Sequence, residues 1–317
     1  MLSELLARRV LIVAGKGGTG KTTITAALAL VAARAGKRVL CIEVDAKGDL
    51  AGALGAEPVG FAPRVVQPRI SVLALLPEES LQEYLRLYFK VPRFTRLTPL
   101  SRIFDFVATG VPGTREMLII GKIAYEEKKI EGGRPSWDII LVDSAATGHV
   151  LPQLRAARAM MELTRGGIIR SQAEWIDALI SDPRRTVLTI CALPEEMPVV
   201  EAIELHDRAL ALPHVAVGAC FLNRTFPLAV TPRQATLAER LAAPEHAADA
   251  AERLGGEVTP LVEATRIACR LHDETERHAR RLRSRMSVPV VEIPIQVATR
   301  PGLATTRAVA ATLDGSW

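Results

Sequence analysis

The chain has 317 residues, of which 49% are hydrophobic and 24% are charged. This excludes a disordered or fibrous protein and favours one large or two small globular domains. Aromatic residues make up only 4% and the net charge is +5, so base stacking on single strands is disfavoured and we expect no nucleic-acid partner.

The first ten residues lack the basic and then apolar order of a signal peptide. The longest apolar stretch, residues 24–33, is about half as long as a membrane span. We therefore expect a cytoplasmic protein that could reach a membrane through a partner.

Three of the four cysteines lie in apolar runs and are expected to be small core residues. No CxxC pair occurs among Cys41, Cys191, Cys220 and Cys269, so the sequence indicates neither a zinc site nor a disulfide framework.

Apolar runs rich in Val, Ile and Leu recur along the chain without polar alternation, which is typical of strands covered on both faces. They span residues 10–14, 38–44, 70–75, 138–142, 186–192, 214–222 and 288–293.

Helical patterns separate most of these runs. One covers 22–35 and ends at Gly36, another runs from about Pro198 to 210, and a third opens at Thr259. This alternation predicts an α/β fold with a doubly wound, mostly parallel sheet. Two longer helical segments, at about 81–130 and 148–180, are interpreted as insertions in a single domain that spans residues 1–317.

Residues 15–23 read GKGGTGKTT and match the phosphate-loop pattern G-x-x-x-x-G-K-[ST] between a predicted strand and a predicted helix. The glycines let backbone N–H groups point at phosphate oxygens, and the helix adds its positive N-terminal end. Lys21 is expected to contact the β- and γ-phosphates, and the Thr22 hydroxyl to ligate Mg²⁺. The residues expected to bind the nucleotide are Gly15, Gly17, Gly18, Thr19, Gly20, Lys21, Thr22 and Thr23.

Lys16, directly after the first glycine, is an additional lysine that the plain pattern does not require. It resembles the deviant phosphate-loop group, which includes the Min and Par positioning ATPases, the nitrogenase iron protein, and the arsenite-pump and tail-anchored-protein-targeting ATPases. In those families the extra lysine reaches across a dimer interface to the partner's nucleotide. The resemblance implies a dimer in which Lys16 acts catalytically in trans.

Two further segments select among these families. Residues 138–151 read DIILVDSAATGHVL; Asp143 ends a predicted buried strand, where it could hold Mg²⁺ through water, and Gly148 could bring its N–H to the γ-phosphate. The segment resembles DTAPTGHTLR of the arsenite-pump and tail-anchored-targeting family. Residues 43–50, EVDAKGDL, fall where that family has its first switch, which implies that Asp45 positions the attacking water.

More matches follow in the same order. Residues 111–116 resemble the family's PGxxE, and residues 193–198 resemble its PEE loop. Asn223 lies where the family recognises adenine, although an Asn at the end of a strand is also typical of a turn. Pro294 lies where the family has a turn beside the base. The resemblance spans about 8–315 and implies a phosphate-loop ATPase domain that uses ATP and Mg²⁺.

Three functions remain open. The first is an ATP-dependent sorting or targeting chaperone whose insertions form an apolar face in the ATP-bound dimer. The second is the energising subunit of an anion efflux system or another membrane-associated assembly. A Min- or Par-like positioning ATPase is less favoured, because residues 304–313 are too neutral for a membrane-binding helix. The expected partners are a second copy or a related ATPase, with a membrane protein or hydrophobic client.

Overall fold

The computed structural model describes residues 2–89, 113–145, 147–212, 214–227, 230–241, 243–297 and 302–315. These residues form an eight-stranded sheet with the order β10-β9-β8-β1-β7-β2-β4-β3. The strands are β1 (Val10–Gly15), β2 (Val39–Glu43), β3 (Arg64–Gln67), β4 (Ile70–Ala74), β7 (Ile139–Asp143), β8 (Thr186–Ala192), β9 (Val217–Thr225) and β10 (Val290–Pro294). Within the described part of this sheet, every pairing is parallel except that of β3 with β4. The predicted fold class is confirmed.

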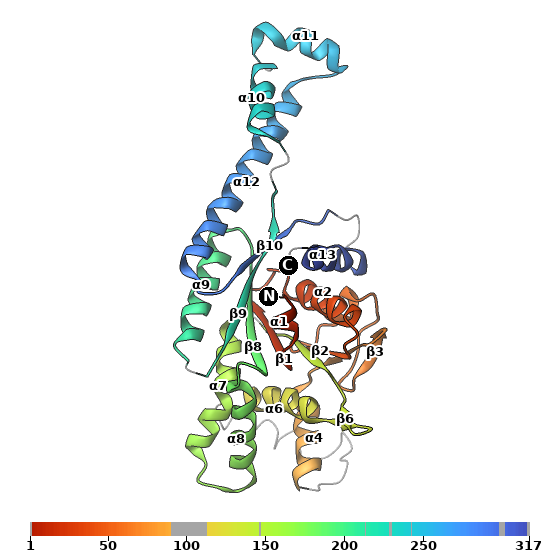
Figure 1. Cartoon of the computed structure of the whole chain (residues 1–317), viewed down its shortest axis with the longest axis vertical. Coiled ribbons are helices and arrows are strands. Elements are labelled where there is room, and N and C mark those ends of the chain that lie inside the picture. Colours follow the sequence, from red (N-terminus) through yellow and green to blue (C-terminus); the bar gives the residue numbers. More distant parts are fainter. Residues whose placement is uncertain are drawn as a thin grey trace.

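The central strands are continuous apolar runs because helices cover both faces of the sheet (Figure 1). One face is packed by α1 (Leu2–Leu6), α2 (Lys21–Arg34), α3 (Asp49–Ala53) and α13 (Leu303–Gly315). The other is packed by α6 (Thr114–Lys128), α7 (Thr147–Leu163), α8 (Gly167–Ser181), α9 (Glu196–Leu210) and the end of α12 (Thr259–Arg285).

The boundary of β9 differs from the sequence-based prediction. The apolar run 214–222 predicted a strand that stops before Asn223, but β9 begins at Val217 and continues to Thr225. The strand is longer because its parallel pairing with β10 continues through Asn223 and Thr225. Asn223 therefore lies within a strand and is buried, instead of standing in a turn.

The two predicted insertions supply a layer of helices. The first contributes α4 (Pro77–Phe89) and α6, the second contributes α7 and α8, and residues 90–112 lie outside the described residues. In Figure 1 these four helices gather at the end of the molecule opposite α10 and α11. A short hairpin of β5 (Ile130–Glu131) and β6 (Arg134–Pro135) then leads from α6 into β7.

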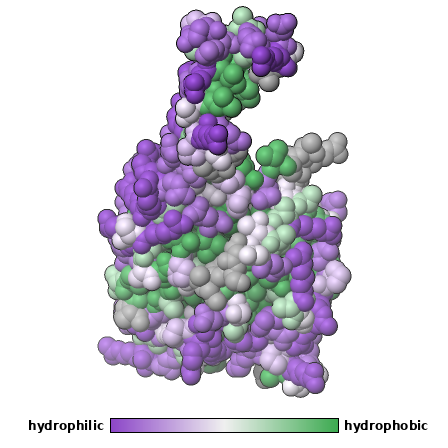
Figure 2. Space-filling model, turned by 45° about the horizontal axis from the view of Figure 1, so that its top comes forward, coloured by the Kyte–Doolittle hydropathy of each residue, from purple (hydrophilic) through white to green (hydrophobic). Residues whose placement is uncertain are grey.

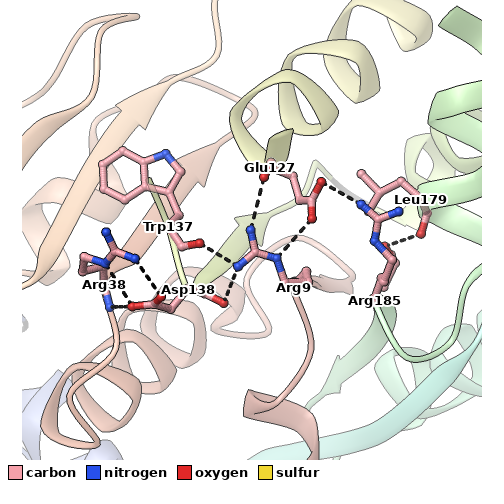
Figure 3. Close-up of polar contacts among 8 residues, drawn as sticks. Arg9, Arg38, Glu127, Trp137, Asp138, Leu179 and Arg185 are labelled. Carbon is pink, nitrogen blue, oxygen red and sulfur yellow. Dashed lines mark hydrogen bonds and ion pairs between the residues drawn. The ribbon is translucent and has the colours of Figure 1, made fainter. Parts of the chain in front are cut away.

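An ion-pair network fixes α6 to the amino ends of the strands (Figure 3). Arg9, directly before β1, donates to the Glu127 carboxylate of α6 at 3.1 Å and to the carbonyls of Trp137 and Asp138 at 2.7 and 3.1 Å. Arg185, directly before β8, donates to the second Glu127 oxygen at 2.8 Å. Because one buried carboxylate is shared by two arginines from the sheet, α6 is held firmly against its edge.

A helical arm projects beyond the carboxyl edge of the sheet (Figure 1). It consists of α10 (Pro232–Leu241), α11 (Pro244–Leu254) and the first part of α12. The sequence predicted the helix that starts at Thr259, but the two short helices before it were not expected. Near its far end the arm carries an apolar patch (Figure 2), and it buries a small core of Ala238, Ala250, Val258 and Val262.

Among the described residues, none of the helices has the length and hydropathy that crossing a membrane requires.

Candidate active site

The predicted phosphate loop lies between β1 and α2 at the carboxyl edge of the sheet. Gly20 needs to be glycine, because its φ is +91° and a Cβ would lie 2.2 Å from the Nδ2 atom of Asn223. The Thr19 hydroxyl is buried and donates to the carbonyl of Lys16 at 2.8 Å. The loop is thus closed by its own hydrogen bond and leads directly into the N-terminus of α2, an arrangement suited to binding phosphate.

Asn223 is attached to this loop. Its Nδ2 donates to the carbonyl of Thr19 at 2.9 Å, and the thiol of Cys191 on β8 donates to the same oxygen at 3.2 Å. This hydrogen bond orients the Asn223 amide, which has a second N–H and a carbonyl oxygen besides.

Thr22 and Asp143, the two residues that the sequence analysis assigned to Mg²⁺, lie in direct contact. The Thr22 hydroxyl donates to Oδ2 of Asp143 at 2.6 Å, which leaves the lone pairs of the hydroxyl oxygen free. Oδ1 of Asp143 is buried, and no described residue donates a hydrogen bond to it. Hydroxyl and carboxylate oxygens are ligands that Mg²⁺ prefers, and a buried carboxylate oxygen without a partner is expected where a cation binds. The residues therefore fit magnesium.

The surroundings of Asp143 disfavour its charge. Burial raises its pKa from 3.8 to about 7, against the opposing effects of the Thr22 hydroxyl and the Lys21 ammonium. The carboxylates of Glu43 and Asp45 act in the same direction as burial. A cation bound here would remove this penalty, since it would pair with the crowded negative charge.

Asp45 is exposed in the loop that follows β2. Glu43 orders this loop, because its carboxylate accepts the N–H groups of Gly48 at 3.1 Å and Leu50 at 3.3 Å while it is only 3% exposed. Sequence reasoning did not identify Glu43 as a functional residue. The sequence did contain a signal for it, because Glu43 is a charged residue near the end of the apolar run 38–44.

The two lysines of the loop make different contacts. The Lys21 ammonium donates to the carbonyl of Lys16 at 3.2 Å and so remains within the loop. The Lys16 ammonium lies 2.6 Å from a carboxylate oxygen of Glu201 on α9. Glu201 was not anticipated either, because 185 residues separate the two partners.

The remaining candidates lie around the same edge of the sheet. Gly148 is the second residue of α7 and is exposed, and Pro294 ends β10 beside Thr225 of β9. Ala146, and residues 111 and 112 of the PGxxE-like segment, lie outside the described residues. The described site thus joins the phosphate loop, the Thr22 and Asp143 pair, the loop of Asp45 and the Asn223 amide at one edge.

Comparison with known proteins finds relatives that are named as ATPases. A family model described as anion-transporting ATPase matches residues 8–170. The chain is 30% identical over 237 residues to the ATPase BagA of Mycobacterium tuberculosis, covering 73% of this chain and 69% of that protein. It is 30% identical over 152 residues to the ATPase get3 of Schizosaccharomyces japonicus, covering 47% and 44%. A protein of Aquifex aeolicus named for an arsenical pump-driving ATPase is 29% identical over 153 residues, covering 47% and 50%.

Proposed function

This chain belongs to the anion-transporting ATPase family, and we propose that it is a Mg²⁺-dependent ATPase whose two-fold dimer binds and releases apolar client segments. The family match and the relatives named as ATPases support ATP hydrolysis. The further statement, that hydrolysis serves protein sorting or targeting, rests on the helical layer described below.

The chemistry follows from the residues at the edge of the sheet. Thr22 and Asp143 would hold Mg²⁺, the latter through water, and Lys21 would contact the β- and γ-phosphates. When bound, Mg²⁺ would neutralise the negative charge that the phosphates and the Asp143 carboxylate bring together. Asp45 would orient the attacking water, and Asn223 would read the adenine edge.

The dimer proposal rests on the additional lysine of the loop, Lys16. Its side chain extends out of the loop as far as α9, while the Lys21 ammonium stays within the loop. A cation at the start of the loop could serve the phosphates of a facing protomer, where it would stabilise the charge that develops on the transferred group. The proposed dimer therefore closes around two ATP molecules, with a second copy or a related ATPase as partner.

The observation that carries the chaperone proposal is an apolar cavity of about 270 Å³ in the helical layer. Its walls come from α4, α6, α7 and α8 and are formed largely by aliphatic and aromatic side chains. The polar wall residues include Lys122 and Glu83, which form a largely buried ion pair at 2.7 Å. The apolar wall residues are Leu81, Tyr84, Leu87, Met117, Leu118, Tyr125, Met160, Ile169, Trp175 and Ile176. Such a cavity suits the side chains of an apolar peptide segment.

Gly121 of α6 allows a direct test. A Cβ there would meet only the Ile176 Cδ1 atom, at 3.8 Å, so Gly121→Leu should fill the cavity without strain in the helix. We expect this variant to lose ATP-dependent binding of a fluorescent apolar peptide of about 20 residues, the length of a membrane span, and to keep its basal ATPase rate. Gly60→Leu, at an exposed loop position with open space around it, is the matched control.

Peptide binding that survives in Gly121→Leu would contradict the client proposal. Hydrolysis stimulated by an oxyanion, without peptide binding, would favour an efflux subunit.

The cysteines argue against a metalloid cargo, because Cys41, Cys191 and Cys220 are buried. Burial raises the pKa of their thiols, that of Cys191 to about 12. Metalloids bind thiolates, and these thiols stay protonated.

A further inference from the structure

The contact between Lys16 and Glu201 has a chemical consequence for the site. The ammonium and the carboxylate are 2.6 Å apart, and their side chains are 38% and 26% exposed. The pair is therefore partly screened by the protein and directly hydrogen-bonded. A lysine paired in this way has its charge neutralised within its own protomer.

Glu201 is the fixed member of the pair. The helix α9 that carries it buries Val199 and Ala202, its neighbours on the inner face, against the sheet. The exposed side of α9 is joined to α12 by ion pairs of Arg281 with Glu196 at 2.6 Å and Arg285 with Asp207 at 3.4 Å. Lys16, by contrast, has a long flexible side chain on a loop that must accommodate phosphate. When the pair separates, Lys16 is the residue that moves.

We propose that Glu201 is a latch that holds Lys16 in the open protomer and releases it only when the dimer closes on ATP. This inference rests on the proposed action of Lys16 in trans. A paired lysine cannot reach the facing nucleotide, so each protomer must break its own pair before it completes the partner's site. The phosphates of the facing ATP, with several negative charges, then replace the single carboxylate. Glu201 thereby keeps hydrolysis slow in chains that meet without two bound nucleotides.

The proposal predicts the direction and size of an effect. Glu201→Gln keeps the shape of the side chain and removes its charge, so Lys16 becomes available without first breaking an ion pair. Partly exposed ion pairs of this kind change equilibria by about two- to fivefold. The variant should therefore raise turnover at limiting protein and ATP concentrations by about that factor.

The decisive experiment places the substitution on one chain of a mixed dimer. Chains that carry Lys16→Ala and Asp45→Ala are coexpressed with different tags, and dimers are purified through both tags. The only complete site lies in the Lys16→Ala chain and uses the lysine of the Asp45→Ala chain, the donor. At limiting ATP, Glu201→Gln in the donor should raise turnover about two- to fivefold, while the same change in the Lys16→Ala chain, which has no lysine to release, should have no effect.

Glu204→Gln in the donor is the matched control, since Glu204 is exposed on the same helix, and it should leave turnover unchanged. If Glu201→Gln slows turnover, changes nothing, or acts equally from either chain, the latch is wrong although Lys16 still acts in trans. If doubly tagged dimers without any change at Glu201 do not form or do not hydrolyse ATP, the proposed trans role itself is wrong and the latch fails with it.

Discussion

Asp143 offers a test of the metal site that requires no nucleotide. The residue is 6% exposed, and burial raises its pKa from 3.8 to about 7. We expect Asp143→Asn to stabilise the metal-free chain at alkaline pH. The amide removes a buried charge and keeps an oxygen that can accept the hydroxyl hydrogen of Thr22.

The size of the effect follows from proton linkage. Below pH 4 the carboxyl group is protonated in the folded and unfolded chain, so its charge has no effect on stability. Between pH 4 and 7 the unfolded chain has released its proton while the folded chain still retains it, and the free energy of unfolding falls as pH rises. Compared with an uncharged side chain, the Asp143 carboxyl group should lower the free energy of unfolding by about 2 kcal/mol at pH 5.5 and by about 4 kcal/mol at pH 8. These values follow because one pKa unit corresponds to about 1.4 kcal/mol.

Urea unfolding in the presence of EDTA measures this difference. Asp143→Asn should exceed the parent in stability by a margin that grows by about 2 kcal/mol between pH 5.5 and pH 8. Glu204→Gln, which removes an exposed carboxylate, should show no such growth. An advantage of Asp143→Asn that is equal at both pH values would refute the assignment of Asp143 as a buried, charge-disfavoured carboxylate.

Three further outcomes are expected. Asp45→Asn should bind ATP as the parent does but hydrolyse it about 100-fold more slowly in single-turnover assays. Hydrolysis at the parent rate would show that Asp45 does not position the attacking water, and Asp49 would be the next candidate. Gly20→Ala should fold but lose most ATP binding in calorimetric titration, because its Cβ would lie 2.2 Å from the amide of Asn223; binding at parental strength would contradict the close approach. Arsenite should not stimulate hydrolysis, because the strand cysteines are buried and protonated, and stimulation that disappears on replacement of a cysteine would overturn this expectation.

The local parts of the site could be predicted from the sequence. The phosphate loop is a contiguous motif, and the strand that leads to Asp143 is an uninterrupted apolar run. Once the sheet is parallel, the carboxyl ends of its strands meet at one edge, so the proximity of Thr22 to Asp143 follows from the topology. These inferences needed only short-range pattern and a general rule of α/β folds.

The parts that escaped prediction depend on distant contacts. The role of Glu43 became visible only through the backbone N–H groups that it accepts, and Glu201 reaches Lys16 across 185 residues. The arm was missed for another reason. Its two short helices begin at Pro232 and Pro244 and span only 10 and 11 residues, so they have little stability of their own, and their packing depends on the long α12 beside them.

The central claim is that Lys16 completes the active site of a facing protomer. Its most direct test is an equimolar mixture of Lys16→Ala and Asp45→Ala chains, each inactive alone, after subunit exchange has been verified with labelled chains. Random pairing makes about half of the dimers mixed, each with one working site of two, so ATP hydrolysis should return to about a quarter of the parent rate. If Lys16 acted within its own chain, every site would lack one group, and an exchanged mixture that remained inactive would contradict the account.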